Sequence, residues 1–152
     1  MGLHLKGFIL PLLILLPNLL LLFFAARNIP QQPSSPPFIF TVLERIGQVT
    51  CFTLPILFGT RIAEQPVNFV TWVMLFCLII YYLCWIRFFW DDREFSILFK
   101  PLAFIPVPMA LCPILYFILL AVWLHSYLFA VPAIVFAIGH LATSWSTYLQ
   151  IK

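Results

Sequence analysis

Charged residues are scarce in this sequence. Lys, Arg, Asp and Glu make up 9% of its 152 residues, whereas a soluble domain carries about 25% of them. Hydrophobic residues make up 64%, and 17 Phe and five Trp contribute much of their bulk. So little polar surface cannot cover a water-soluble globule. The composition therefore excludes a soluble enzyme or binding domain, and lipid is the expected solvent.

Common catalytic and metal-binding motifs are also missing. The sequence has no HExxH, no GxSxG and no clustered acidic motif for a metal. Its cysteines lie inside apolar stretches without CxxC or Cys/His spacing, as is typical of small buried side chains: Cys51, Cys77, Cys84 and Cys112. The net charge of +3 forms no basic stripe that could follow a phosphate backbone. We therefore expect no metal, no cofactor and no nucleic-acid partner.

Long apolar runs fill most of the chain. A helix needs about 20 apolar residues to cross the hydrocarbon core. Such runs predict an all-α polytopic membrane bundle in one domain, with five transmembrane helices at residues 7–26, 38–59, 69–86, 101–124 and 127–148. The first run is too long for a signal peptide and no A-x-A site closes it. Because prolines crowd the run at residues 101–124 as far as Pro113, we expect that helix to be irregular or broken.

Lys and Arg are distributed unequally between the two sides of the membrane that the predicted helices define. With five crossings, most of them fall on one side of the membrane: Arg27, Arg45, Arg87, Arg93, Lys100 and Lys152. Only Lys6 and Arg61 fall on the other side. The more basic side of a membrane protein is usually cytoplasmic. We therefore expect a plasma-membrane protein with its N-terminus outside and its C-terminus in the cytoplasm.

Several polar side chains fall inside the predicted helices, where hydrocarbon cannot solvate them. At about 1.5 Å per residue, Glu44 lies about 9 Å from the cytoplasmic end of its helix, and Asn18 and His140 about 12 Å. The predicted ligand-binding residues lie at similar depth or share a helical stripe with one of these three: Asn18, Glu44, Gln48, Tyr81, His140 and Ser144. Tyr82 and Trp85 accompany Tyr81 on the third helix. A polar stripe facing lipid would stay unpaired, so we expect the stripes of the second and fifth helices to face inward and toward each other.

These residues are compatible with three functions. The favoured one is a cytoplasm-facing intramembrane pocket that binds or moves a small molecule, a lipid or a proton, since a carboxylate and an imidazole at one depth can exchange a proton. The second is a membrane-embedded lipid-modifying enzyme with His140 or Glu44 as general base. The third is an accessory subunit of a larger membrane complex, without chemistry, whose Phe-rich outer face packs on its partner. Its polar residues would then only hold the bundle together by hydrogen bonds. A second copy of the chain is the other protein partner considered. In each case membrane lipid surrounds the protein.

Overall fold

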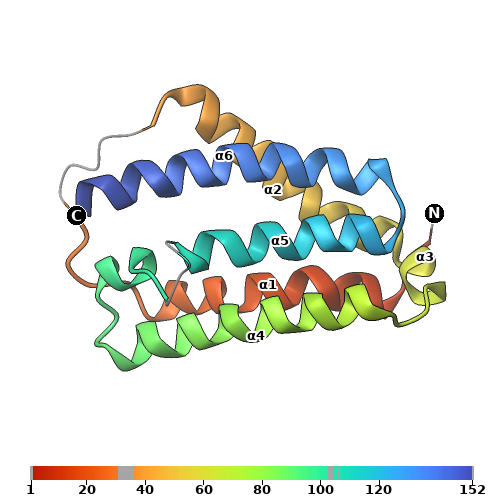
Figure 1. Ribbon diagram of the computed structural model, residues 1–152, viewed down its shortest axis with the longest axis horizontal. Coiled ribbons are helices and arrows are strands. Elements are labelled where there is room, and N and C mark those ends of the chain that lie inside the picture. Colours follow the sequence, from red (N-terminus) through yellow and green to blue (C-terminus); the bar gives the residue numbers. More distant parts are fainter. Residues whose placement is uncertain (1, 31–35, 103–104, 106, 152) are drawn as a thin grey trace.

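The protein is a bundle of helices (Figure 1). The computed structural model describes residues 2–30, 36–102, 105 and 107–151. The described residues are 80% helical and contain no strand. The elements run in the order α1 (Leu5–Phe23), α2 (Phe38–Leu57), α3 (Gly59–Glu64), α4 (Phe69–Trp90), the 3-10 helix η1 (Phe95–Phe99), α5 (Pro108–Trp123) and α6 (Tyr127–Ile151). The two ends of the chain lie at opposite ends of the bundle.

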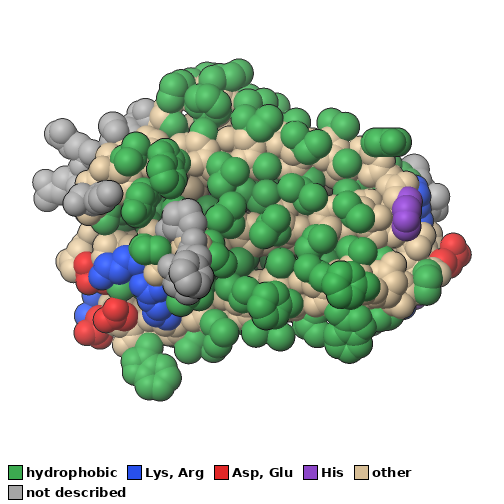
Figure 2. All heavy atoms as spheres, viewed as in Figure 1, with side chains coloured by type: hydrophobic (Ala, Val, Ile, Leu, Met, Phe, Trp, Pro, Cys, Tyr) green, Lys and Arg blue, Asp and Glu red, His purple; other side chains and the backbone are tan. Residues whose placement is uncertain are grey.

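Four helices, α1, α2, α4 and α6, are long and apolar enough to cross a membrane. Their outer faces carry large exposed hydrophobic side chains, such as Phe76, Ile79 and Leu83 on α4. Figure 2 shows hydrophobic side chains over most of the visible face and charged side chains at its two ends. An apolar surface of this extent needs lipid around it, so the protein is embedded in a membrane.

The fifth apolar helix is shorter than the sequence predicts. The prediction is one helix over residues 101–124, but α5 begins at Pro108 and has 16 residues. At about 24 Å it is shorter than the hydrocarbon core of about 30 Å. Proline fits the first turn of a helix but breaks its interior, and Pro108 occupies that first turn. The expected irregularity therefore lies at the start of α5, where Pro101 and Ile105 belong to no helix.

Other boundaries also differ from the prediction. The first helix ends at Phe23 instead of Ala26, while α4 continues to Trp90 and α6 to Ile151. The segments between the predicted helices at residues 60–68 and 87–100 contain most of α3 and all of η1, so two short helices lie where the sequence predicts breaks. The backbone of Arg27 pairs with the segment before η1, because its N–H donates to the Arg93 carbonyl at 2.8 Å. The end of α1 is thus tied to the loop that follows α4.

The packing places α5 at the centre of the bundle. It lies between α4 and α6 and contacts both (Figure 1), and most of its side chains are buried, including Tyr116, Phe117 and Leu120. The most extensive contact joins α2 and α6. Gly47 and Gly139 make that contact close, because a Cβ atom at either position would overlap the backbone of the facing helix. Small residues at helix contacts allow this backbone approach in membranes.

Candidate intramembrane binding site

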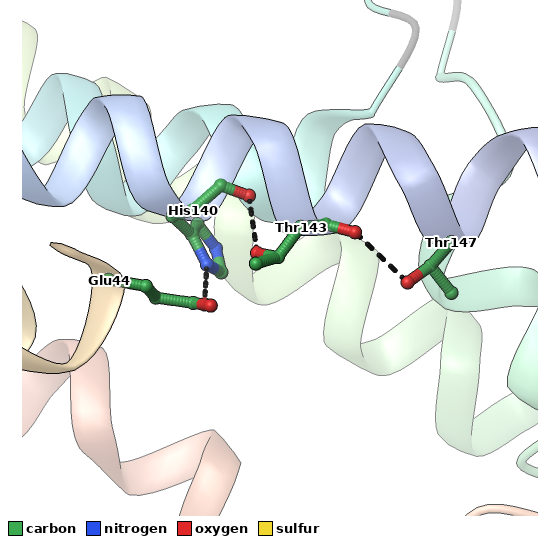
Figure 3. Close-up of polar contacts among 4 residues, drawn as sticks. All are labelled: Glu44, His140, Thr143 and Thr147. Carbon is green, nitrogen blue, oxygen red and sulfur yellow. Dashed lines mark hydrogen bonds and ion pairs between the residues drawn. The ribbon is translucent and has the colours of Figure 1, made fainter. Parts of the chain in front are cut away.

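Glu44 on α2 and His140 on α6 face each other across the close helix contact (Figure 3). The distance from His140 Nδ1 to Glu44 Oε1 is 2.6 Å. The side chains of Glu44 and His140 are 21% and 25% exposed. With Glu44 ionised, its carboxylate accepts this hydrogen bond from the Nδ1–H tautomer of His140. The prediction that these two side chains turn toward each other is confirmed.

Neighbouring residues on α6 fix the position of the imidazole. The Phe136 ring, one turn earlier, stacks on it with 4.9 Å between centroids and 19° between planes. A Cβ at Gly139 would overlap the Glu44 backbone, so this glycine brings the two helices within hydrogen-bonding reach. The Thr143 hydroxyl donates to the His140 carbonyl at 3.1 Å (Figure 3). The pair is therefore held by helix packing as well as by its own hydrogen bond.

A cavity of about 220 Å³ lies beside this pair, inside the bundle. Its lining comes from α1, α2, α4, η1, α5 and α6. Five of the six predicted site residues line it: Asn18, Gln48, Tyr81, His140 and Ser144. Glu44 is not among the lining residues and reaches the cavity only through His140. The similar depth predicted from the sequence therefore corresponds to one shared space.

The walls of the cavity are mostly apolar. Phe52, Leu98, Met109, Pro113 and Phe136 supply much of the surface. No Lys, Arg, Asp or Glu occurs among the described residues that line it. Apolar walls with a few polar groups are typical of small-molecule sites.

Asn18 and Tyr81 join α1 to α4 at the edge of the cavity. The Asn18 Nδ2 donates to the Tyr81 hydroxyl at 2.8 Å and to the Ile14 carbonyl at 3.1 Å. The Tyr81 hydroxyl itself donates to the Ile14 carbonyl at 3.3 Å. These side chains therefore satisfy each other, as interhelical hydrogen bonds in a membrane commonly do.

Tyr82 compensates for a proline in α1. Pro17 has no N–H with which to hydrogen-bond the Leu13 carbonyl one turn earlier. The Tyr82 hydroxyl on α4 donates to that carbonyl at 2.8 Å. A neighbouring helix thus satisfies the backbone group that the proline leaves free, as hydrocarbon requires.

Other polar groups of the cavity have no partner among the described residues. The Trp85 side chain is 4% exposed, and its Nε1 is buried without a hydrogen bond. The Tyr81 hydroxyl lies close by, but the geometry is not that of a hydrogen bond. Ser144 is 7% exposed, and neither its hydroxyl nor the half-buried Gln48 amide is bonded in the described part of the chain. A fully buried donor without a partner, such as Trp85 Nε1, is rare.

Asn18 on α1 is the exposed residue of the cavity lining, whereas the other described lining residues are buried or half-buried. Leu98 and Phe99 of η1 also line the cavity, so it lies toward the η1 end of the bundle. The lining of the cavity therefore reaches the surface of the bundle at Asn18.

The chain has no match among protein-family models, curated proteins or solved structures. The site must be interpreted from its own geometry. Sequence reasoning misses the role of Trp85, since indoles near a helix end are usually interfacial anchors. Trp85 lies one helical turn after Tyr81, and this spacing indicates that the two side chains lie on the same face of α4. The lack of a partner for its N–H depends on side-chain packing, which the sequence does not reveal.

Proposed function

We propose that the protein binds a small lipid-soluble molecule in this intramembrane cavity. The observation that carries the proposal is a set of polar groups on the cavity wall without partners among the described residues: Trp85 Nε1, which is fully buried, and the Ser144 hydroxyl and Gln48 amide. A buried donor without an acceptor costs about 1–3 kcal/mol. A structural role alone would favour apolar residues or mutual pairing at these positions. A ligand with polar groups would remove that cost.

Binding is tested by filling the cavity from α6. Ser144→Phe places a ring in the cavity, whereas Leu141→Phe adds a ring on the exposed side of the same helix. In native mass spectrometry of protein extracted in mild detergent, we expect a discrete bound mass on the wild type and on Leu141→Phe, and its loss from Ser144→Phe. A bound mass that persists on Ser144→Phe, or that is missing from all three proteins, contradicts the proposal.

The orientation in the membrane is part of the proposal. Five crossings of the plasma membrane, with the N-terminus outside, agree with chain ends at opposite ends of the bundle. Arg87, Arg93 and Lys100 lie in or beside the loop between α4 and α5, and such basic loops are usually cytoplasmic. The cavity then lies in the cytoplasmic half of the membrane.

Labelling of engineered cysteines tests this orientation. Ser96→Cys, in η1, is expected to resist a membrane-impermeant maleimide in intact cells and to react after permeabilisation. Val67→Cys, exposed between α3 and α4, is expected to react in intact cells. The four native cysteines are buried and serve as an unreactive background. The opposite labelling pattern would show that the protein has the reverse orientation in the membrane.

Catalysis on a lipid is a second candidate function. The observation that favours it is the bond between Glu44 and His140 Nδ1, because it leaves His140 Nε2 as the ring nitrogen available to act as a base. In this reading the bound molecule is a substrate. Turnover of a membrane lipid that His140→Ala abolishes would favour it over simple binding.

A further inference from the structure

The lining of the cavity favours an uncharged ligand. A buried anion needs a cation or several donors nearby, and no cationic side chain is among the described lining residues. The nearest acidic group, Glu44, is already paired with His140, so it leaves a cationic ligand without a free counter-ion. Fatty acids, phosphates and amines therefore fit this cavity poorly.

The polar atoms that have no partner among the described residues lie on two sides of the cavity. Trp85 Nε1 is on α4, while the Ser144 hydroxyl and His140 Nε2, the ring nitrogen not bonded to Glu44, are on α6. Helix α5 lies between these two helices (Figure 1). An indole N–H only donates, so Trp85 requires an acceptor on the ligand. The Ser144 hydroxyl can donate or accept. A ligand with an oxygen at each of two edges would satisfy both sides.

The walls and the size of the cavity suit a ring. Aromatic side chains from four elements, Phe52, Trp85, Phe99 and Phe136, supply faces and edges for ring contacts. An apolar cavity of about 150 Å³ holds benzene, so a cavity of about 220 Å³ accepts a ring with substituents. The exposed part of the lining at Asn18 provides a path for a hydrocarbon tail into the bilayer.

We propose that the cavity binds the ring of a quinone or quinol, with one ring oxygen accepting from Trp85 Nε1. The other ring oxygen accepts from the Ser144 hydroxyl, or, in a quinol, its hydroxyl donates to His140 Nε2. This inference rests on the proposed function, since it names the class of molecule that occupies the same cavity. The isoprenoid tail leaves past Asn18, so the molecule enters sideways from the membrane. The proposal concerns binding and includes no electron transfer.

The test measures binding of decylubiquinone to the purified full chain in detergent by equilibrium dialysis. Saturable binding is expected for the wild type. Trp85→Phe removes the N–H and keeps an aromatic ring, and it is expected to weaken binding about five- to tenfold, as for one lost hydrogen bond. Trp72→Phe, at a 63% exposed position on the same helix, is expected to bind like the wild type. Ser144→Ala removes the hydroxyl on the opposite wall, and it is also expected to weaken decylubiquinone binding.

Two comparison probes separate this inference from the proposed function. Palmitate tests an anion and monoolein tests a neutral lipid without a ring. Saturable binding of monoolein without binding of decylubiquinone overturns the quinone inference and leaves the binding pocket supported. Equal decylubiquinone affinity in the wild type, Trp85→Phe and Ser144→Ala also overturns it. If none of the three probes binds saturably, both proposals fail.

Discussion

Gly139→Val is expected to destabilise the bundle by about 3 kcal/mol or more, the upper range for an overpacked site. The reason is that a Cβ at this position overlaps the backbone N and Cα of Glu44. Backbone atoms of a packed helix cannot turn aside as a side chain can, so α2 and α6 must separate. Unfolding in mixed micelles titrated with sodium dodecyl sulfate measures the change through the loss of helical circular dichroism.

Leu141→Val is the matched control, because it introduces the same β-branched residue on the exposed side of α6. We expect the unfolding midpoint of this variant to stay close to that of the wild type. Similar losses in the two variants would mean that valine itself disfavours the helix. The close contact at Gly139 would then not limit stability.

His140→Leu is expected to destabilise the protein by about 2 kcal/mol or more, because it leaves a buried carboxylate without its partner. Removing one member of a fully buried ion pair costs about 3–5 kcal/mol, and the partial exposure of Glu44, 21%, lowers that cost. Glu44→Gln in the same variant removes the unpaired charge. We therefore expect the double variant to be more stable than His140→Leu alone, measured by the same unfolding titration.

Glu64→Gln is the control for this rescue. Glu64 is exposed at the end of α3, so its replacement is expected to leave the stability of His140→Leu unchanged. A double-mutant cycle of this kind isolates the coupling between two side chains. Coupling of zero between Glu44 and His140 would show that the 2.6 Å contact contributes nothing to stability.

The helices were predictable because hydrocarbon imposes one simple requirement, a long apolar helix for each crossing. The starts of α2, α4 and α6 at Phe38, Phe69 and Tyr127 match the sequence prediction. The start of α5 does not match, because apolar composition alone cannot distinguish a helix from an apolar segment that proline keeps out of the helix. Hydropathy is equally insensitive to η1, whose sequence, FSILF, is apolar but forms a short 3-10 helix.

The pairing of Glu44 with His140 was predictable for a similar reason, since hydrocarbon solvates neither group. Depth along each helix and helical face were sufficient to place Asn18, Gln48 and Tyr81 on one cavity. They were insufficient to distinguish residues that line the cavity from residues that only hold a lining residue in place, because that depends on how far each side chain reaches. Glu44 for this reason lies behind His140, outside the lining.

The late start of α5 has a consequence for how the pocket can change. A helix that continued back to Pro101 would add turns next to Val107 and Met109, which now line the hollow. The position at which α5 begins thus helps to set the shape of the hollow. Point substitutions on the wall can therefore change which ligand is preferred without changing the backbone fold. This property favours evolutionary divergence of ligand specificity.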